Sequence, residues 1–92
     1  MKETIYRMKP VTVRAHQMSL DWDPPQWLGE EIVNGNVWCQ GGPTPYLTVR
    51  TPEGDQRCDV GDWVIKGSGP GNLAVCHGEI FHELYEEQAT WQ

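Results

Sequence analysis

The chain has 92 residues, which is enough for one small domain and too few for a second hydrophobic core. Its 13 acidic residues outnumber its 7 lysines and arginines, and the formal charge of −6 argues against binding duplex nucleic acid through its phosphates. Its 3 scattered cysteines do not suit a secreted disulfide framework, and neither a signal peptide nor a membrane-spanning run is visible, so we expect a soluble cytoplasmic protein.

We expect residues 1–92 to form a single domain that begins with a loose end over 1–8. Apolar and polar residues then alternate from Val11 to Gln17, which predicts a strand whose valines and alanine face the core and whose His16 faces outward. A second, short strand is predicted at Val37–Cys39, ahead of a loop rich in glycine and proline.

One helix is predicted over 24–33, between these two strands. Asp23 can cap its first turn, and the two prolines that follow suit the N-terminal end of a helix. Leu28 and Ile32 stand four residues apart and are expected to face the core. The acidic residues of the helix, Glu31 among them, are expected to face water.

The middle of the chain carries the strongest β signal. Tyr46–Thr51 alternates apolar and polar residues, Pro52–Asp55 is typical of a turn, and Gln56–Val60 is expected to return antiparallel. Gly54 is the residue that can take the left-handed conformation such a turn requires. Trp63–Lys66 is the most apolar short run, and we expect this strand at the centre of the sheet.

The last clear strand is predicted at Leu73–Cys76. Residues 79–87 fit a helical turn, and they fit a short turn followed by an edge strand nearly as well. Residues 88–92 are expected to be a loose end. The pattern therefore predicts an α+β fold that is mostly β: a twisted antiparallel sheet or half-barrel of about five short strands, with one helix packed on it.

Several short motifs occur in a recognisable order: Lys9-Pro10-Val11-Thr12-Val13-Arg14-Ala15, Gly61-Asp62-Trp63-Val64-Ile65-Lys66-Gly67, Ile80-Phe81 and Tyr85-Glu86. This order resembles a widespread group of small bacteriophage and prophage proteins, the PGDYG-like group. Its members open with a "KKPVVVEA"-like strand, carry a "PGDYIIKG"-like segment and end in "IF..YE". The resemblance implies a phage origin and a compact, mainly β fold.

The chain departs from that group at three places. Val60 replaces its usual proline, Trp63 replaces its usual tyrosine, and residues 75–79 lack the prolines common there. None of these changes breaks the strand pattern. The group supplies no established catalytic residue that could be assigned to this chain.

Candidate metal ligands and nucleophiles are present but lack the usual spacing. They are His16, Cys39, Cys58, Cys76, His77 and His82, without the closely spaced pairs of a zinc site. Cys76 with His82 or His16 is a conceivable nucleophile and base, but nothing local marks such a pair, and residues 67–71 lack the Lys-Ser/Thr of a phosphate-binding loop. We therefore expect no metal, no cofactor and no enzymatic activity.

Five tryptophans are more than a domain of this size requires for its core. Trp63 is expected in the core, whereas Trp22, Trp27 and Trp38 flank the helix and its loops. With basic residues at outward strand positions, they could bind a planar anionic ligand or a partner; the alternative is that they cover a thin sheet. The candidate site residues are Trp22, Trp27, Trp38, Arg50, Arg57 and Lys66.

The hypothesis that follows places this site where the start of the helix meets the strand carrying Trp38. The expected function is that of a phage-encoded, non-enzymatic binding protein in the cytoplasm of the infected bacterium. It would counter host defence by sequestering a small nucleotide signal or by binding a host protein, and it is expected to be a homodimer. The alternatives are a virion or assembly component and a small Cys/His enzyme.

Overall fold

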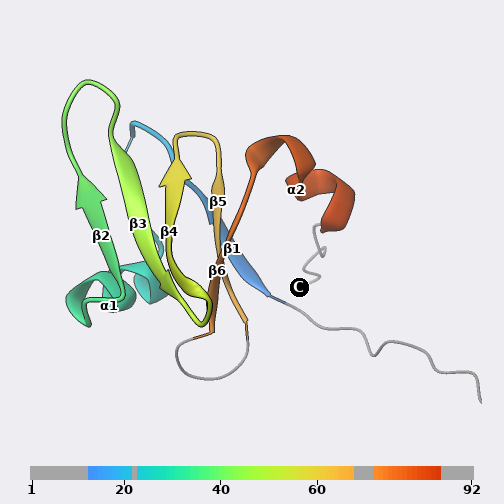
Figure 1. Ribbon diagram of the computed structural model, residues 1–92, viewed down its shortest axis with the longest axis horizontal. Coiled ribbons are helices and arrows are strands. Elements are labelled where there is room, and N and C mark those ends of the chain that lie inside the picture. The colour runs from blue at the N-terminus through green and yellow to red at the C-terminus, as the bar shows by residue number, and fades with distance from the viewer. Residues whose placement is uncertain (1–12, 22, 68–71, 86–92) are drawn as a thin grey trace, which may run out of the picture.

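Two small antiparallel sheets and two helices make up the computed structural model, which describes residues 13–21, 23–67 and 72–85 (Figure 1). The first sheet has the order β1-β5-β6, with β1 at Arg14–Gln17, β5 at Trp63–Lys66 and β6 at Leu73–Cys76. The second has the order β2-β3-β4, with β2 at Val37–Gln40, β3 at Tyr46–Thr51 and β4 at Gly54–Asp59. The helices are α1 at Gln26–Val33 and α2 at Gly78–Leu84.

The predicted mostly-β class is confirmed, but its detail differs. Six strands in two sheets replace a single sheet of about five strands, and a second helix accompanies the expected one among the described residues. The ambiguous segment after β6 is helical over Gly78–Leu84, because the His77 side chain accepts a hydrogen bond from the Glu79 N–H and caps the first turn. The strand at Trp63–Lys66 is indeed central, although within its own three-stranded sheet.

The β3–β4 hairpin follows the predicted alternation closely. Leu47 and Val49 are fully buried, and Thr51 lies opposite Gly54 across a two-residue turn. Gly54 has φ of 116°, a conformation that disfavours residues with a Cβ. The Thr51 hydroxyl donates to the Gly54 carbonyl at 2.6 Å and accepts from the Glu53 N–H at 3.2 Å, which fixes the turn.

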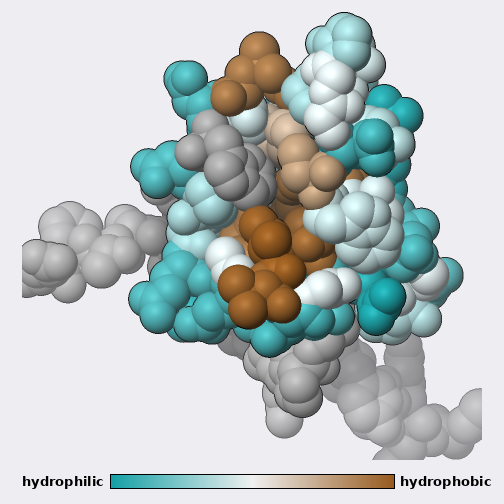
Figure 2. Space-filling model, turned by 90° about the vertical axis from the view of Figure 1, so that its left-hand side faces the viewer, coloured by the Kyte–Doolittle hydropathy of each residue, from teal (hydrophilic) through white to brown (hydrophobic). Residues whose placement is uncertain are grey.

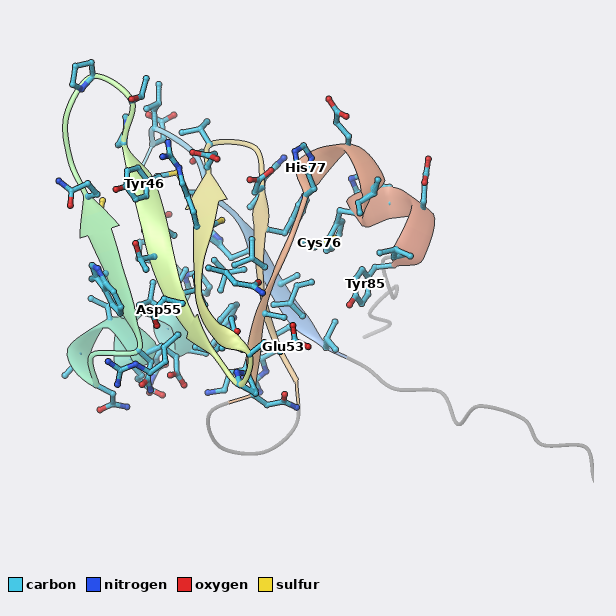
Figure 3. All side chains as sticks on the ribbon, viewed as in Figure 1. Tyr46, Glu53, Asp55, Cys76, His77 and Tyr85 are labelled. Carbon is cyan, nitrogen blue, oxygen red and sulfur yellow. The ribbon has the colours of Figure 1, made fainter. Side chains whose placement is uncertain are left out.

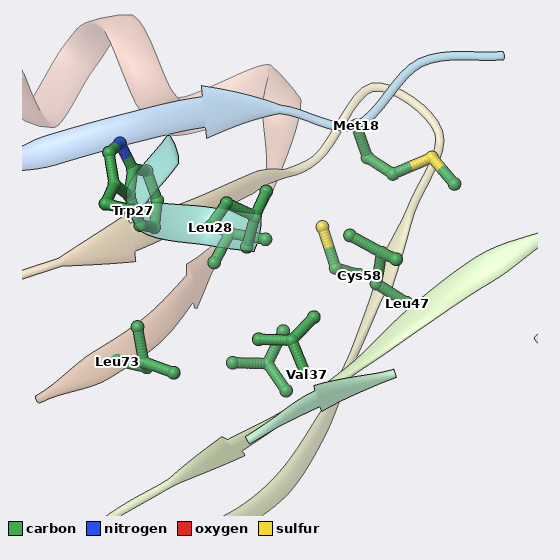
Figure 4. Packing of buried hydrophobic residues seen from close by; sticks show 9 residues of the cluster. Met18, Trp27, Leu28, Val37, Leu47, Cys58 and Leu73 are labelled. Carbon is green, nitrogen blue, oxygen red and sulfur yellow. The ribbon is translucent and has the colours of Figure 1, made fainter. Parts of the chain in front are cut away.

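The main core lies between the two sheets, and α1 closes one side of it. Leu28 of α1 is fully buried there, and Figure 4 shows it among side chains from both sheets. The buried members of this cluster are Met18, Trp27, Leu28, Val37, Leu47, Val49, Cys58, Val64 and Leu73. A cluster of aliphatic groups of this kind supplies most of the hydrophobic stabilisation that a small domain can obtain.

A second, smaller cluster lies on the opposite face of the β1-β5-β6 sheet, beneath α2. Phe81 of α2 stacks on Trp63 with ring centroids 3.9 Å apart and contributes to this cluster with Ile65 and Cys76. Trp63 is therefore part of the packing, as expected. This sheet has side chains packed on both faces, which explains why the outward orientation predicted for His16 is wrong: His16 is half-buried.

Helix α1 differs from its prediction at the first turn and on its polar side. It begins at Gln26 with Pro25 as its N-cap, and no side chain caps it, so the predicted capping role of Asp23 is wrong. Pro25 has an extended backbone at the start of the helix, and its carbonyl accepts from the N–H groups of Leu28 and Gly29.

Neither described helix is long and apolar enough to cross a membrane.

Glu31, which was expected to face water, is buried because two partners compensate its charge. Its Oε1 accepts from Lys66 Nζ at 2.9 Å and its Oε2 accepts from Asn36 Nδ2 at 2.9 Å. These contacts hold the pKa of Glu31 below its usual value, the Asn36 hydrogen bond being the largest cause. The network ties α1 to β5 across the core.

The corner between β4 and β5 joins three parts of the chain. Asp62 Oδ1 accepts from the Gly78 N–H at 3.0 Å, and its main-chain carbonyl accepts from the Met18 N–H at 2.9 Å. Gly61 donates to the Met18 carbonyl at 2.8 Å. A Cβ at Gly78 would clash with the carbonyl oxygen of Gly61, so this close approach requires glycine at position 78.

Candidate functional site

The outer face of the β2-β3-β4 sheet collects the exposed aromatic and basic side chains. Alternation along the strands directs every second residue away from the core, and the register places these residues in rows across the sheet. We call this surface the outer face; its residues are Trp38, Gln40, Tyr46, Thr48, Arg50, Asp55, Arg57 and Asp59. Figure 3 shows that Tyr46 and Asp55 mark opposite ends of the β3–β4 hairpin on this surface.

Trp38 and Arg50 form the part of the outer face that is available to a ligand. Trp38 is 39% exposed, and the Arg50 guanidinium carbon lies 6.0 Å from the centre of its ring. Arg50 is exposed and has no acidic group within 4.0 Å among the described residues, although Asp55 lies opposite it in the register. The pair therefore combines a partly exposed aromatic ring with a positive charge that has no carboxylate partner among the described residues.

Arg57 and Tyr46 form a second pair whose charge is already compensated. The Arg57 guanidinium lies 3.9 Å from the centre of the Tyr46 ring. Its Nε donates to Asp59 Oδ1 at 2.7 Å, with both side chains about half exposed. The guanidinium covers the tyrosine ring and its charge is balanced, so this pair offers less to an anion than Arg50 does.

Two of the other predicted site residues, Trp27 and Lys66, lie away from Trp38 and Arg50. Trp27 belongs to the main core and is only 9% exposed, because it packs beside Leu28 instead of standing on the surface. Lys66, expected to face outward, is directed at Glu31 and forms the partly buried ion pair described above. Trp22 lies outside the described residues. The expected meeting of Trp27 with Trp38 on one surface is therefore wrong, and among the predicted site residues that the structure describes, Trp38, Arg50 and Arg57 share a face.

Five residues of the outer face were not among the predicted site residues: Gln40, Tyr46, Thr48, Asp55 and Asp59. A signal for two of them was present, since the burial of Leu47 and Val49 directs Tyr46 and Thr48 to the same side as Arg50. What the sequence did not show is the pairing of β2 with β3, which sets Trp38 opposite Thr48 and Gln40 opposite Tyr46.

Two of the three cysteines, Cys58 and Cys76, are buried. Burial raises the pKa of Cys58 to about 12, with the charges of Asp62 and Asp59 adding to the effect. Burial also raises the pKa of Cys76, whose Sγ donates to the His77 carbonyl at 3.7 Å. Within the described residues, no three His, Cys, Asp or Glu side chains converge as metal ligands would.

A different surface, made by α1, β2 and the segment before α1, is apolar. Figure 2 shows brown, hydrophobic atoms gathered on this side of the molecule and ringed by polar ones. The exposed apolar side chains in these elements include Leu20, which is 74% exposed, and Val33, which is 87% exposed. Cys39 of β2 is also exposed. We call this surface the α1 side.

Comparison with protein-family models, with curated proteins and with solved structures finds no match to this chain. The likeness to the PGDYG-like phage group therefore stays a prediction from the motifs alone.

Proposed function

We propose that this chain is a non-enzymatic binding protein of phage origin that acts in the cytoplasm of an infected bacterium. There it counters host defence, by holding a small nucleotide signal or by covering a host protein. The observation that carries the proposal is the exposed indole of Trp38 beside the uncompensated guanidinium of Arg50. Aromatic and arginine side chains are the residues most enriched at the energetic centres of binding surfaces.

The scaffold supports a binding role because it holds these side chains on regular structure. Trp38 and Arg50 lie on adjacent strands, and the strands are backed by the fully buried Val37 and Val49. A rigid sheet presents side chains without the ordering cost that a flexible loop would incur on binding. The motifs shared with small phage proteins suggest the cellular setting.

The experiment is an infection assay in bacteria that carry a nucleotide-signalling defence. Cells expressing the wild-type chain are expected to let a sensitive phage form plaques, whereas cells expressing Trp38→Ala are expected to remain protected. Leu84→Ala is the matched control, since Leu84 is an exposed apolar residue on α2, away from the outer face. Immunoblots must show equal amounts of all three proteins.

Two results contradict the proposal. One is a Trp38→Ala variant that folds and counters defence as well as the wild type. The other is mass spectrometry that finds the protein in purified virions in stoichiometric amount, which would make it a virion component.

A homodimer is part of this proposal. The apolar α1 side would lose its contact with water if two copies met there, and burial of apolar surface stabilises by about 25 cal/mol per Å². Leu20 and Val33 are the exposed side chains that such a contact would cover.

A further inference from the structure

We infer that the outer face binds a single nucleotide unit, with its base stacked on Trp38 and one phosphate group paired with Arg50. This inference rests on the proposed function of the face as a binding surface and names the chemistry of its ligand. The shared chemistry is a nucleobase with one phosphate charge, whether that phosphate is a monoester or part of a cyclic phosphodiester.

The indole of Trp38 supplies the stacking surface. Trp38 lies on β2 and is 39% exposed, and every nucleobase has a π face that can lie against such a ring. Thr48 is directly opposite Trp38 on β3, and Gln40 follows it on the same side of β2. Their hydroxyl and amide groups supply donors and acceptors beside the ring, where the edge of a stacked base would lie.

Arg50 supplies the contact for the phosphate. Its guanidinium carbon lies 6.0 Å from the centre of the Trp38 ring, so both groups can contact one small ligand. It forms no ion pair among the described residues, so a phosphate would not have to displace a carboxylate. A guanidinium can also donate two parallel hydrogen bonds to one phosphate, which fixes its position.

The surrounding charges limit the ligand to one phosphate. Arg57 already shares its charge with Asp59 at 2.7 Å, and Lys66, in the other sheet, is paired with Glu31 at 2.9 Å, so a second phosphate would have to compete with a carboxylate for either cation. Asp55 lies opposite Arg50, and the chain as a whole carries −6. A triphosphate or a single-stranded polymer would meet repulsion beyond the first phosphate, because each additional charge needs its own cation.

The test is a calorimetric titration of the full chain with seven probes: adenosine and guanosine 5′-monophosphates, the corresponding 3′,5′-cyclic monophosphates, adenosine, inorganic phosphate, and adenosine triphosphate. We expect at least one mononucleotide to bind about tenfold more tightly than adenosine, inorganic phosphate and the triphosphate. Whether the monoester or the cyclic form binds more tightly identifies the source of the phosphate. The inference is overturned if no mononucleotide binds, or if the triphosphate binds more tightly.

Two variants assign the contacts. Trp38→Ala should weaken mononucleotide binding about tenfold or more, and Arg50→Gln should reduce it to the affinity of adenosine. Arg14→Gln is the matched control for Arg50→Gln, because Arg14 is an exposed arginine on β1 in the other sheet, without an acidic partner within 4.0 Å among the described residues. Equal affinities of the Arg14→Gln and Arg50→Gln variants would overturn the assignment of the phosphate to Arg50.

The infection assay separates this inference from the proposed function. If Trp38→Ala abolishes the effect on host defence while no mononucleotide binds the wild type, the face contacts a host protein and the nucleotide inference is wrong. If mononucleotides bind through Trp38 and Arg50 while Trp38→Ala still counters host defence, the site stands and the proposed function is wrong.

Discussion

Lys66→Met should destabilise the fold by leaving the Glu31 carboxylate buried beside a single hydrogen-bond donor. The Glu31 side chain is 8% exposed and accepts from Lys66 and Asn36, each at 2.9 Å. Removing one partner of a fully buried ion pair costs about 3–5 kcal/mol. Because the Lys66 side chain is 25% exposed, water reaches this site, and we expect a loss of about 1–3 kcal/mol in the free energy of unfolding.

The assay is urea unfolding followed by tryptophan fluorescence, supported by thermal unfolding. In a domain of this size, each 1 kcal/mol corresponds to about 4–8 °C in Tm. Arg57→Met is the matched control, since its ion pair with Asp59 has both side chains more than half exposed. Exposed pairs contribute about 0–1 kcal/mol, so the control should lose much less stability than Lys66→Met.

The pH dependence of the free energy of unfolding provides a second, independent test of the contribution of the Glu31–Lys66 ion pair. The pKa of Glu31 is lower in the folded protein than its usual value of 4.5, so its ionised form stabilises the fold above that pH. This stabilisation is lost as the pH falls through the folded-state pKa. Once Glu31 is protonated in both proteins, the difference between wild type and Lys66→Met should shrink.

Two outcomes would refute this account. One is a Lys66→Met variant that loses no more stability at neutral pH than Arg57→Met. The other is a difference from wild type that stays constant down to a pH at which the carboxylate is protonated. Glu31→Gln in the Lys66→Met background removes the buried charge and should recover part of the lost stability, while retaining an oxygen for the Asn36 amide.

Three further predictions follow from burial and exposure. Leu28→Ala should lower the free energy of unfolding by about 2–5 kcal/mol, because Leu28 is fully buried, while Leu84→Ala, at an exposed site, should change it by less than about 0.5 kcal/mol in the same urea assay. The pKa of Cys58 is raised to about 12 in the fold, so stability should fall as the pH rises above the usual thiol value of 9.0, and Cys58→Ala should reduce that fall. Val33→Lys should dissociate the proposed homodimer in light scattering, and a wild-type monomer at high micromolar concentration would contradict the dimer.

The local β structure could be predicted because each element carries its own signal. The alternation that buries Leu47 and Val49 is complete within β3, and Gly54 provides the backbone conformation that the turn requires. The same alternation directed Trp38 outward from Val37. These predictions needed only the period of two residues that a strand imposes.

The predictions that proved wrong concern residues whose surroundings are formed by segments distant in the chain. Glu31 is buried because Lys66, 35 residues later, lies beside it, and nothing in the helix sequence shows that partner. Trp27 is likewise buried by distant segments, because α1 packs against both sheets and this makes Trp27 a core residue. The division into two sheets also determined which basic residues share a face with Trp38, and strand pairing of this kind is not encoded by periodicity alone.

The corner at Asp62 has a consequence for hydrogen exchange. The amide hydrogens of Met18, Gly61 and Gly78 are bonded at one point although they lie in three separate parts of the chain. Separating the β4–β5 corner from its neighbours releases all three at once, so their exchange rates should respond together to denaturant, as members of one cooperative unit. Residues on the exposed β3–β4 turn, such as Glu53, form no part of that unit and should exchange independently.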